Sequence, residues 1–162
     1  MMAMNTAKTD RAIGSDMVKI YLDVCCLHRP FDDQTQERIR LEAEAILLIL
    51  TQSQKKEVTW VSSEIVKLEV RQNPDAEGVR RVNLLLQSAQ HEVVLGTAEQ
   101  VRATELEALG FHAFDAMHLA CAESGQVDCF LTTDDKLLRR AQRFARHLKI
   151  KVENPIHYLL NH

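Results

Sequence analysis

The stretch VKIYLD, residues 18–23, combines β-branched and aromatic residues and ends in a carboxylate. Such a run favours a short buried strand, and Asp23 comes directly after it. The stretch CFLTTD, residues 129–134, has the same character and ends in Asp134. Because ligands of an open parallel sheet bind outside the carboxyl ends of its strands, we expect these two aspartates to face one crevice.

Around these two stretches, short apolar runs alternate with amphipathic segments. The strands that we expect are 18–22, 57–61, 92–95, 129–133 and 150–152. The helices that we expect begin near Asp33 and end near Gln54, then cover 63–72, 77–89, 97–110, 114–123 and 137–148. This alternation predicts an α/β fold, a three-layer α/β/α sandwich around a short, mainly parallel sheet.

Local signals mark several helix ends. Asp33 with Gln36, and Thr97 with Gln100, have the spacing of capping boxes. Gly110 is a favourable residue for ending a helix. These pairs predict that the two helices start at Asp33 and Thr97.

Other segments have irregular character. Residues 25–33 contain a proline and two acids, which predicts a loop, and Pro155 predicts a short turn. Ser62 or Ser63 is expected to cap the helix that follows the second strand.

Length and composition exclude several classes of protein. The chain has 162 residues, 46% hydrophobic and 27% charged, which is typical of one globular domain. Lys and Arg number 20 and Asp and Glu 23, so any nucleic-acid binding must use a local patch. The longest apolar run, residues 45–50, is too short to span a membrane.

Residues 1–16 are polar and lack the apolar segment of a secretory signal, so we expect a flexible tail before one domain, 17–162. The four cysteines form no Cys-x-x-Cys pair, and buried reduced thiols in the cytoplasm are the expected state. The five glycines have neither P-loop nor dinucleotide-binding spacing.

Two further acids accompany Asp23 and Asp134: Glu69 lies on the helix after the second strand, and Asp115 begins a later helix. Acids converging from separate segments repel one another unless a cation binds between them, and oxygen ligands suit Mg²⁺ or Mn²⁺. Each acid also has an ordinary structural explanation: Asp23 as the cap of a turn, Asp115 and Asp134 as helix N-caps, and Glu69 as a solvated residue. From the residues alone, both interpretations stay open.

Four segments in order resemble the PIN-domain family, which includes the VapC-like toxins of bacterial toxin–antitoxin pairs. They are YLDVC at 21–25, SSEIVKLE at 62–69, FDAMHLA at 114–120 and FLTTDDKLL at 130–138. The resemblance extends from about residue 18 to residue 155.

This resemblance implies a metal-dependent endoribonuclease acting on single-stranded or looped RNA, with Mg²⁺ or Mn²⁺ as cofactor. The acids that it implies as catalytic metal ligands are Asp23, Glu69, Asp115 and Asp134. Their arrangement would suit two-metal hydrolysis of a phosphodiester. The resemblance also implies a homodimer and a small antitoxin protein as partner.

Other residues have expected supporting roles. Those expected to hydrogen-bond the metal ligands are Thr132, Thr133, Asp135 and His118. On the helix after the fourth strand, the residues expected to contact an RNA backbone are Lys136, Arg139, Arg140 and Arg143. An ordinary solvated helix face is the alternative for that basic set.

The sequence departs from the family after Asp23, where Val24 and Cys25 replace the usual hydroxyl or amide residues; we expect no supporting hydrogen bonds from these two side chains. A PIN-like module that binds RNA or a protein but cuts weakly or not at all is therefore the alternative function. A haloacid-dehalogenase-like phosphatase is disfavoured because Cys25 stands where its second aspartate belongs. Glu64 competes with Glu69, and Asp135 with Asp134; we favour Glu69 and Asp134.

Overall fold

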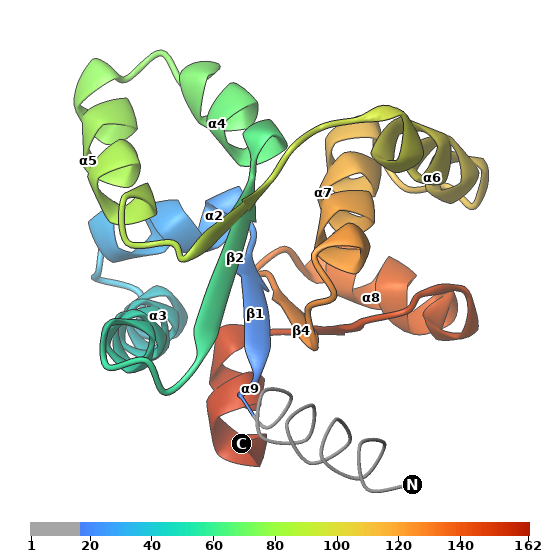
Figure 1. Ribbon diagram of the computed structural model, residues 1–162. Helices are drawn as coiled ribbons and strands as arrows, with labels where there is room; N and C mark the ends of the chain where they lie inside the picture. Colours follow the sequence, from blue (N-terminus) through green and yellow to red (C-terminus); the bar gives the residue numbers. More distant parts are fainter. Residues whose placement is uncertain (1–16) are drawn as a thin grey trace, which may run out of the picture.

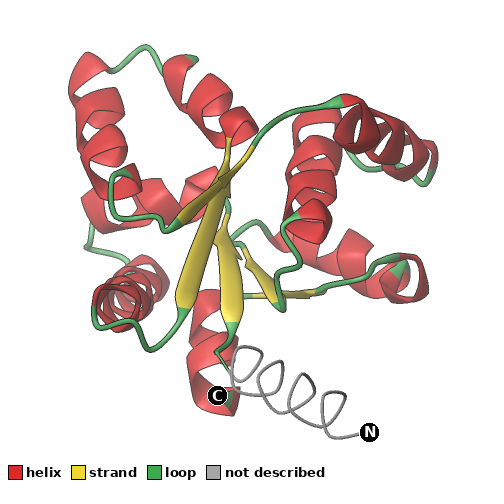
Figure 2. Ribbon diagram, viewed as in Figure 1, coloured by secondary structure: helices red, strands yellow, loops and turns green. Residues whose placement is uncertain are grey.

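The computed structural model describes residues 17–162, so the expected tail lies outside the described residues. Its five strands form one parallel sheet in the order β3-β2-β1-β4-β5 (Figures 1 and 2). The strands are β1 (Lys19–Leu22), β2 (Thr59–Ser63), β3 (His91–Val93), β4 (Cys129–Leu131) and β5 (Lys151–Glu153). The predicted α/β fold is confirmed, and every strand pairing is parallel.

Helices cover both faces of this sheet. They are α2 (Val24–His28), α3 (Glu37–Gln54), α4 (Glu64–Arg71), α5 (Ala76–Leu86), α6 (Thr97–Ala108), α7 (Ala113–Ser124), α8 (Asp135–Arg143) and α9 (Pro155–Asn161), with 3-10 turns η1 (Arg29–Phe31) and η2 (Ala145–His147). Figure 1 shows α2, α3 and α5 on one side and α6, α7 and α8 on the other. Within the described residues, no helix has the length and hydropathy needed to cross a bilayer.

The core lies between these layers and includes the buried residues of β1. Tyr21 of β1 stacks on Phe130 of β4, with ring centroids 5.1 Å apart, and both are fully buried. Trp60 of β2 is also fully buried. Such packing accounts for the aromatic residues in these short strands.

Two predicted helix ends are confirmed. The Ser63 hydroxyl accepts a hydrogen bond from Val66 N–H and caps α4. Gly110 follows α6 with φ of +109°, a conformation that glycine adopts without a Cβ clash.

Three local predictions are wrong. Residues 25–33 are mainly helical, as α2 and η1, because the Asp23 carboxylate caps α2 through Val24 N–H. Asp33 instead accepts from Thr35 N–H, and α3 begins at Glu37 without a side-chain cap. The segment after Asn154 forms α9 rather than a short turn.

The second capping box also fails, because α6 begins after Gly96 and Thr97 is its first helical residue. A tertiary hydrogen bond precedes this start: Leu95 N–H donates to Oε1 of Glu64 at 3.3 Å. This hydrogen bond connects the approach to α6 with α4, and no side chain caps the start of α6.

Candidate active site

Asp23 lies where β1 ends and α2 begins, and it is 6% exposed. Its Oδ1 accepts from Val24 N–H at 2.9 Å, and its Oδ2 accepts from the Thr132 hydroxyl at 2.8 Å. Burial raises the pKa of Asp23, while His118 and the Thr132 hydrogen bond oppose that rise. The carboxylate is thus held in one orientation at the carboxyl edge of the sheet.

Cys25 lies beside this carboxylate. Its Sγ is 3.5 Å from Asp23 Oδ2 and 3.4 Å from the Thr132 hydroxyl, and it accepts from Thr133 N–H at 3.4 Å. The expectation that the Cys25 side chain supplies no hydrogen bond near Asp23 is therefore wrong. A thiol is nevertheless a weaker donor than the hydroxyl or amide usual in the family.

Glu69 enters the same region from α4. Its Oε1 lies 3.1 Å from Nε2 of His118, a fully buried residue of α7. Glu64, one helical turn earlier, accepts instead from Leu95 N–H. The structure thus brings Glu69, and not Glu64, toward His118.

A chain of hydrogen bonds extends from His118 into the core. Its Nδ1 lies 2.7 Å from the Tyr21 hydroxyl, which lies 2.6 Å from the Ser63 hydroxyl. An ionised Glu69 only accepts hydrogen bonds, so a neutral His118 donates from Nε2 and accepts at Nδ1. The Tyr21 hydroxyl then donates to His118 and accepts from Ser63, which satisfies every member of the chain.

Sequence reasoning missed Tyr21 and Ser63 as parts of this site. A tyrosine inside a buried strand is a detectable signal, because its hydroxyl needs a hydrogen-bond partner there. The sequence does not reveal which partner a distant segment supplies.

Asp115 lies in the first turn of α7, whose N-cap is His112. The alternative explanation of Asp115 as an N-cap is therefore wrong. Burial first, and then the negative charges of Asp23, Asp134 and Glu69, raise the pKa of Asp115 to about 6. Its electrostatic environment thus includes the other three predicted acids.

Asp134 and Asp135 have different surroundings. Asp134 caps α8 by accepting from Lys136 N–H at 2.9 Å, and its own N–H donates to the Thr132 hydroxyl at 3.1 Å. Asp135 forms a two-pronged ion pair with Arg38 of α3, at 2.6 and 2.8 Å. Thr132 therefore connects Asp134 with Asp23, whereas the hydrogen bonds of Asp135 go to α3.

The order of these segments along the chain, from the strand before Asp23 to the helix after Asp134, matches a known family. The PIN domain family model matches residues 20–143. The chain belongs to the PIN-domain family. Members of this family are nucleases that use divalent metals.

Solved structures with this PIN fold include two at low sequence identity. VapBC2 from Rickettsia felis, bound to a DNA fragment from its promoter, aligns with a TM-score of 0.53 and 15% identity, covering 85% of this chain and 98% of the other. VapBC-1 from nontypeable Haemophilus influenzae aligns with a TM-score of 0.55 and 13% identity, with the same coverage. Among curated proteins, no sequence matches this chain significantly.

The residues of this PIN domain suit a divalent cation. One ligand atom from each of Asp23, Glu69 and His118 lies within 4.8 Å of the others. Carboxylate oxygens are the ligands that Mg²⁺ and Mn²⁺ prefer. Burial, and after it repulsion from the other carboxylates, raises the pKa of Asp115, and a cation would offset that repulsion.

His118 and Thr133, both expected to support the metal ligands, differ in their hydrogen bonds. His118 has both ring nitrogens engaged, by Tyr21 and Glu69, so it orients Glu69 through a hydrogen bond. Thr133 is 5% exposed, and its buried hydroxyl has no hydrogen-bond partner among the described residues.

The basic residues lie on α8, whose N-terminus is capped by Asp134. Within residues 17–162, none of the four forms an ion pair with a carboxylate: Lys136, Arg139, Arg140 and Arg143. Their charges are therefore not neutralised by side-chain carboxylates in this part of the chain, and the Arg143 guanidinium lies 5.3 Å from the centroid of the Phe144 ring.

Proposed function

We propose that this PIN domain, residues 17–162, is a Mg²⁺- or Mn²⁺-dependent endoribonuclease that hydrolyses single-stranded or looped RNA. The observation that carries the proposal is the approach of Asp23 and Glu69, whose ligand atoms lie within 4.8 Å of each other and of His118. Burial, and after it the negative charges of Asp23, Asp134 and Glu69, also raise the pKa of Asp115. Such repulsion lowers stability unless a cation is bound, which is typical of sites shaped for function.

We propose that Asp23, Glu69, Asp115 and Asp134 hold the metal. A divalent cation at this place would polarise the scissile phosphate and lower the pKa of an attacking water. Thr132 orients Asp23, His118 orients Glu69, and the backbone N–H groups at the start of α8 orient Asp134. The protein's main task is then to keep the carboxylates in place before substrate arrives.

RNA as the substrate is supported by the cations of α8. A chain with 20 basic and 23 acidic residues has no general attraction for nucleic acid, so a local group must supply it. The first of the four unpaired cations of α8, Lys136, comes two residues after Asp134. They would hold the phosphates on either side of the cleaved bond.

The test is cleavage of an RNA pool containing single strands and hairpins, with Mn²⁺, Mg²⁺ or EDTA. The intact protein is compared with Asp115→Asn and with the control Asp135→Asn, whose carboxylate pairs with Arg38 outside the acid cluster. We expect metal-dependent cleavage by the intact protein and the control, and none by Asp115→Asn. Equal cleavage by all three proteins would contradict the site.

A role as the toxin of a toxin–antitoxin pair, neutralised by a small antitoxin, is a further part of the proposal. It is supported by the fold shared with VapBC2 and VapBC-1. We also propose a homodimer and a cytoplasmic location, where the four free cysteines stay reduced. The toxin role is tested by expressing the protein in cells: we expect growth arrest, which Asp115→Asn should abolish. The dimer is tested by light scattering of the purified protein.

The second candidate is a PIN-like module that binds RNA or a protein and cuts weakly or not at all. The weak thiol contact between Cys25 and Asp23 favours it. Metal binding without cleavage by the intact protein would support this candidate. If the thiol is the cause, Cys25→Ser should restore cleavage, because a hydroxyl is the stronger donor to Asp23.

A further inference from the structure

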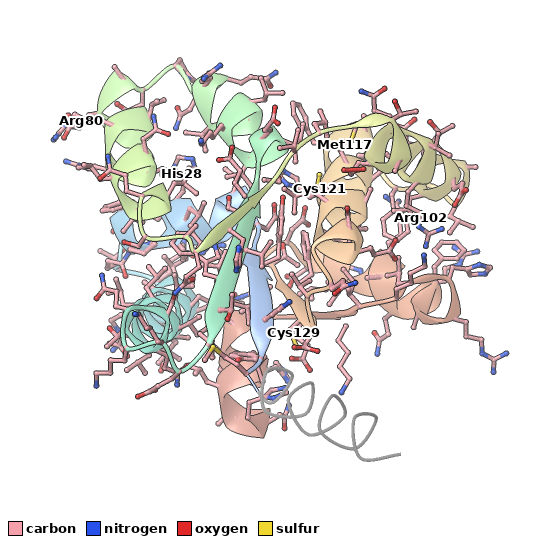
Figure 3. The ribbon with its side chains drawn as sticks, in the orientation of Figure 1. His28, Arg80, Arg102, Met117, Cys121 and Cys129 are labelled. Atoms are coloured by element: carbon pink, nitrogen blue, oxygen red, sulfur yellow. The ribbon has the colours of Figure 1, made fainter. Side chains whose placement is uncertain are left out.

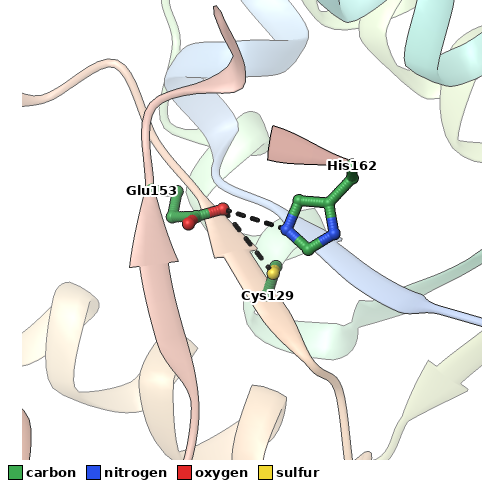
Figure 4. A group of neighbouring side chains, drawn as sticks. All are labelled: Cys129, Glu153 and His162. Atoms are coloured by element: carbon green, nitrogen blue, oxygen red, sulfur yellow. Dashed lines mark hydrogen bonds and ion pairs between the residues drawn. The ribbon is translucent and has the colours of Figure 1, made fainter. Parts of the chain in front are cut away.

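A second group of ligand-type side chains lies apart from the acids that follow β1 and β4. Cys129 begins β4, Glu153 ends β5, and His162 follows α9. Figure 4 shows the three side chains pointing toward one another. In Figure 3, Cys129 lies on β4, away from Met117 and Cys121 of α7. The group shares no side chain with the proposed nuclease site.

The distances in this group are close to those of a tetrahedral zinc site. Cys129 Sγ lies 3.7 Å from Glu153 Oε2, and His162 Nε2 lies 3.8 Å from the same oxygen. All three ligand atoms lie within 4.8 Å of one another. Zinc with sulfur, nitrogen and oxygen ligands requires about 3.5 Å for the first separation and about 3.3 Å for the second. These two separations therefore need adjustments of only a few tenths of an ångström, and the Sγ–Nε2 separation, which lies within 4.8 Å, must close to about 3.5 Å.

The surroundings hold two of the three ligands in position. Cys129 is 1% exposed, so its place in the sheet is fixed by packing. The His162 ring stacks on the buried Tyr158 ring, with centroids 4.6 Å apart. Cys129 and His162 therefore lose little conformational entropy when the group binds an ion.

The group opens into a pocket of about 980 Å³, which Asp128 and His157 also line. This space leaves room for a fourth ligand. Because structural zinc sites are almost always closed by four protein ligands, one of these two neighbours would take the fourth position.

We propose that Cys129, Glu153 and His162 form a second metal site, which takes a borderline transition-metal ion such as Zn²⁺. The mixture of thiolate, imidazole and carboxylate favours Zn²⁺ over Mg²⁺, which prefers oxygen ligands alone. The thiol proton of Cys129 leaves to solvent on binding, so the sulfur coordinates as thiolate. A bound ion would join β4, β5 and the end of α9, and its role is to stabilise this corner of the fold.

The test uses Co²⁺ as a spectroscopic substitute for Zn²⁺, with the full chain freed of any purification tag. We expect intense tetrahedral visible bands and a thiolate-to-cobalt charge-transfer band, both displaced by Zn²⁺. Cys129→Ser should abolish the charge-transfer band. The matched control is Cys25→Ser, which removes the only thiol contacting Asp23 and should leave that band intact.

Because Cys129 is buried, its substitution carries a risk of misfolding. His162→Ala changes an exposed residue and keeps the strands, and it should weaken Zn²⁺ binding by at least roughly tenfold. Zn²⁺ should also raise the melting temperature of Asp115→Asn, in which the nuclease site is impaired, but not that of the double variant Asp115→Asn/His162→Ala.

Three results would overturn the proposal. They are an octahedral, weakly coloured Co²⁺ complex, a charge-transfer band that Cys25→Ser removes, and unchanged Zn²⁺ affinity in folded His162→Ala. None of these readouts depends on RNA cleavage, so failure of the nuclease proposal leaves this test intact.

Discussion

His118 donates a hydrogen bond from Nε2 to a carboxylate oxygen of Glu69, 3.1 Å away, and accepts one at Nδ1 from the Tyr21 hydroxyl. A residue of the core strand β1 thus fixes the tautomer of a histidine on α7. That histidine in turn orients an acid on α4. Three elements distant in sequence are therefore connected through one imidazole ring.

Removing the Tyr21 hydroxyl should affect both stability and metal binding. In Tyr21→Phe, Ser63 and His118 Nδ1 lose a buried partner, so we expect the free energy of unfolding to fall by about 1–3 kcal/mol. Freed from its fixed tautomer, His118 should orient Glu69 less well and weaken Mn²⁺ binding roughly tenfold. Urea denaturation and titration calorimetry measure the two effects. Tyr158→Phe is the control, because within residues 17–162 its hydroxyl makes no hydrogen bond; an equal loss in both variants would contradict this account.

Thr132 offers a test of how Asp23 is oriented. Thr132→Val keeps the shape but removes the donor to Asp23 and the acceptor for Asp134 N–H. We expect Mn²⁺ affinity to fall by about 10- to 100-fold, whereas Thr132→Ser, which keeps the hydroxyl, should stay within a few-fold of the intact protein. If the Thr132→Val variant binds Mn²⁺ as tightly as the Thr132→Ser variant does, Thr132 has no part in orienting the metal ligands.

Asp115 should make the stability of the metal-free protein depend on pH. Its pKa is about 6 in the folded protein and ordinarily 3.8, so folding favours the protonated form. Below its ordinary pKa, the Asp115 carboxyl does not lower the free energy of unfolding. Its full destabilising effect is present once the pH exceeds the pKa in the folded protein.

In EDTA at neutral pH, we therefore expect Asp115→Asn to be more stable than the intact protein by about 1–2 kcal/mol, allowing for solvent screening. The difference should vanish as the pH falls below 3.8, and saturating Mn²⁺ should cancel or reverse it. Thermal unfolding across pH, with and without metal, measures this. If the difference in stability between the two proteins does not change with pH, the charge of Asp115 does not destabilise the metal-free fold.

The two neighbouring aspartates after β4 should behave differently on substitution. Asp134→Asn keeps a capping side chain but removes a charge near Asp115, so we expect RNA cleavage to be lost while the fold is kept. Asp135→Asn breaks only an exposed ion pair with Arg38, so cleavage should stay within about twofold and stability within about 1 kcal/mol. Cleavage assays and circular dichroism on both variants check this. A greater loss of cleavage in Asp135→Asn than in Asp134→Asn would make Asp135 the metal ligand.

Features that depend on neighbours in sequence were predictable here. The β-branched and aromatic composition of residues 18–22 predicts a strand, Ser63 is a suitable cap, and Gly110 ends a helix, because each effect acts within a few residues. The four segments that resemble PIN domains also indicate the family, and the family match confirms it.

Features that depend on distant segments were not predictable. The helix from Val24 to His28 begins on an Asp23 carboxylate that Thr132, the residue after β4, also holds. The start of α6 follows a loop that Glu64 anchors, against the local capping signal. Tertiary hydrogen bonds of this kind leave no mark on the local sequence.

The sequence by itself determined the alternation of strands and helices and the order in which the four acids occur, because periodicity and strand ends are local properties. Only the tertiary structure decided that Glu69 rather than Glu64 faces His118, that Asp135 pairs with Arg38, and that Cys129 lies beside His162. The physical reason is that parallel pairing joins strands far apart in the chain. The register and the packing of the helices then set which side chains meet.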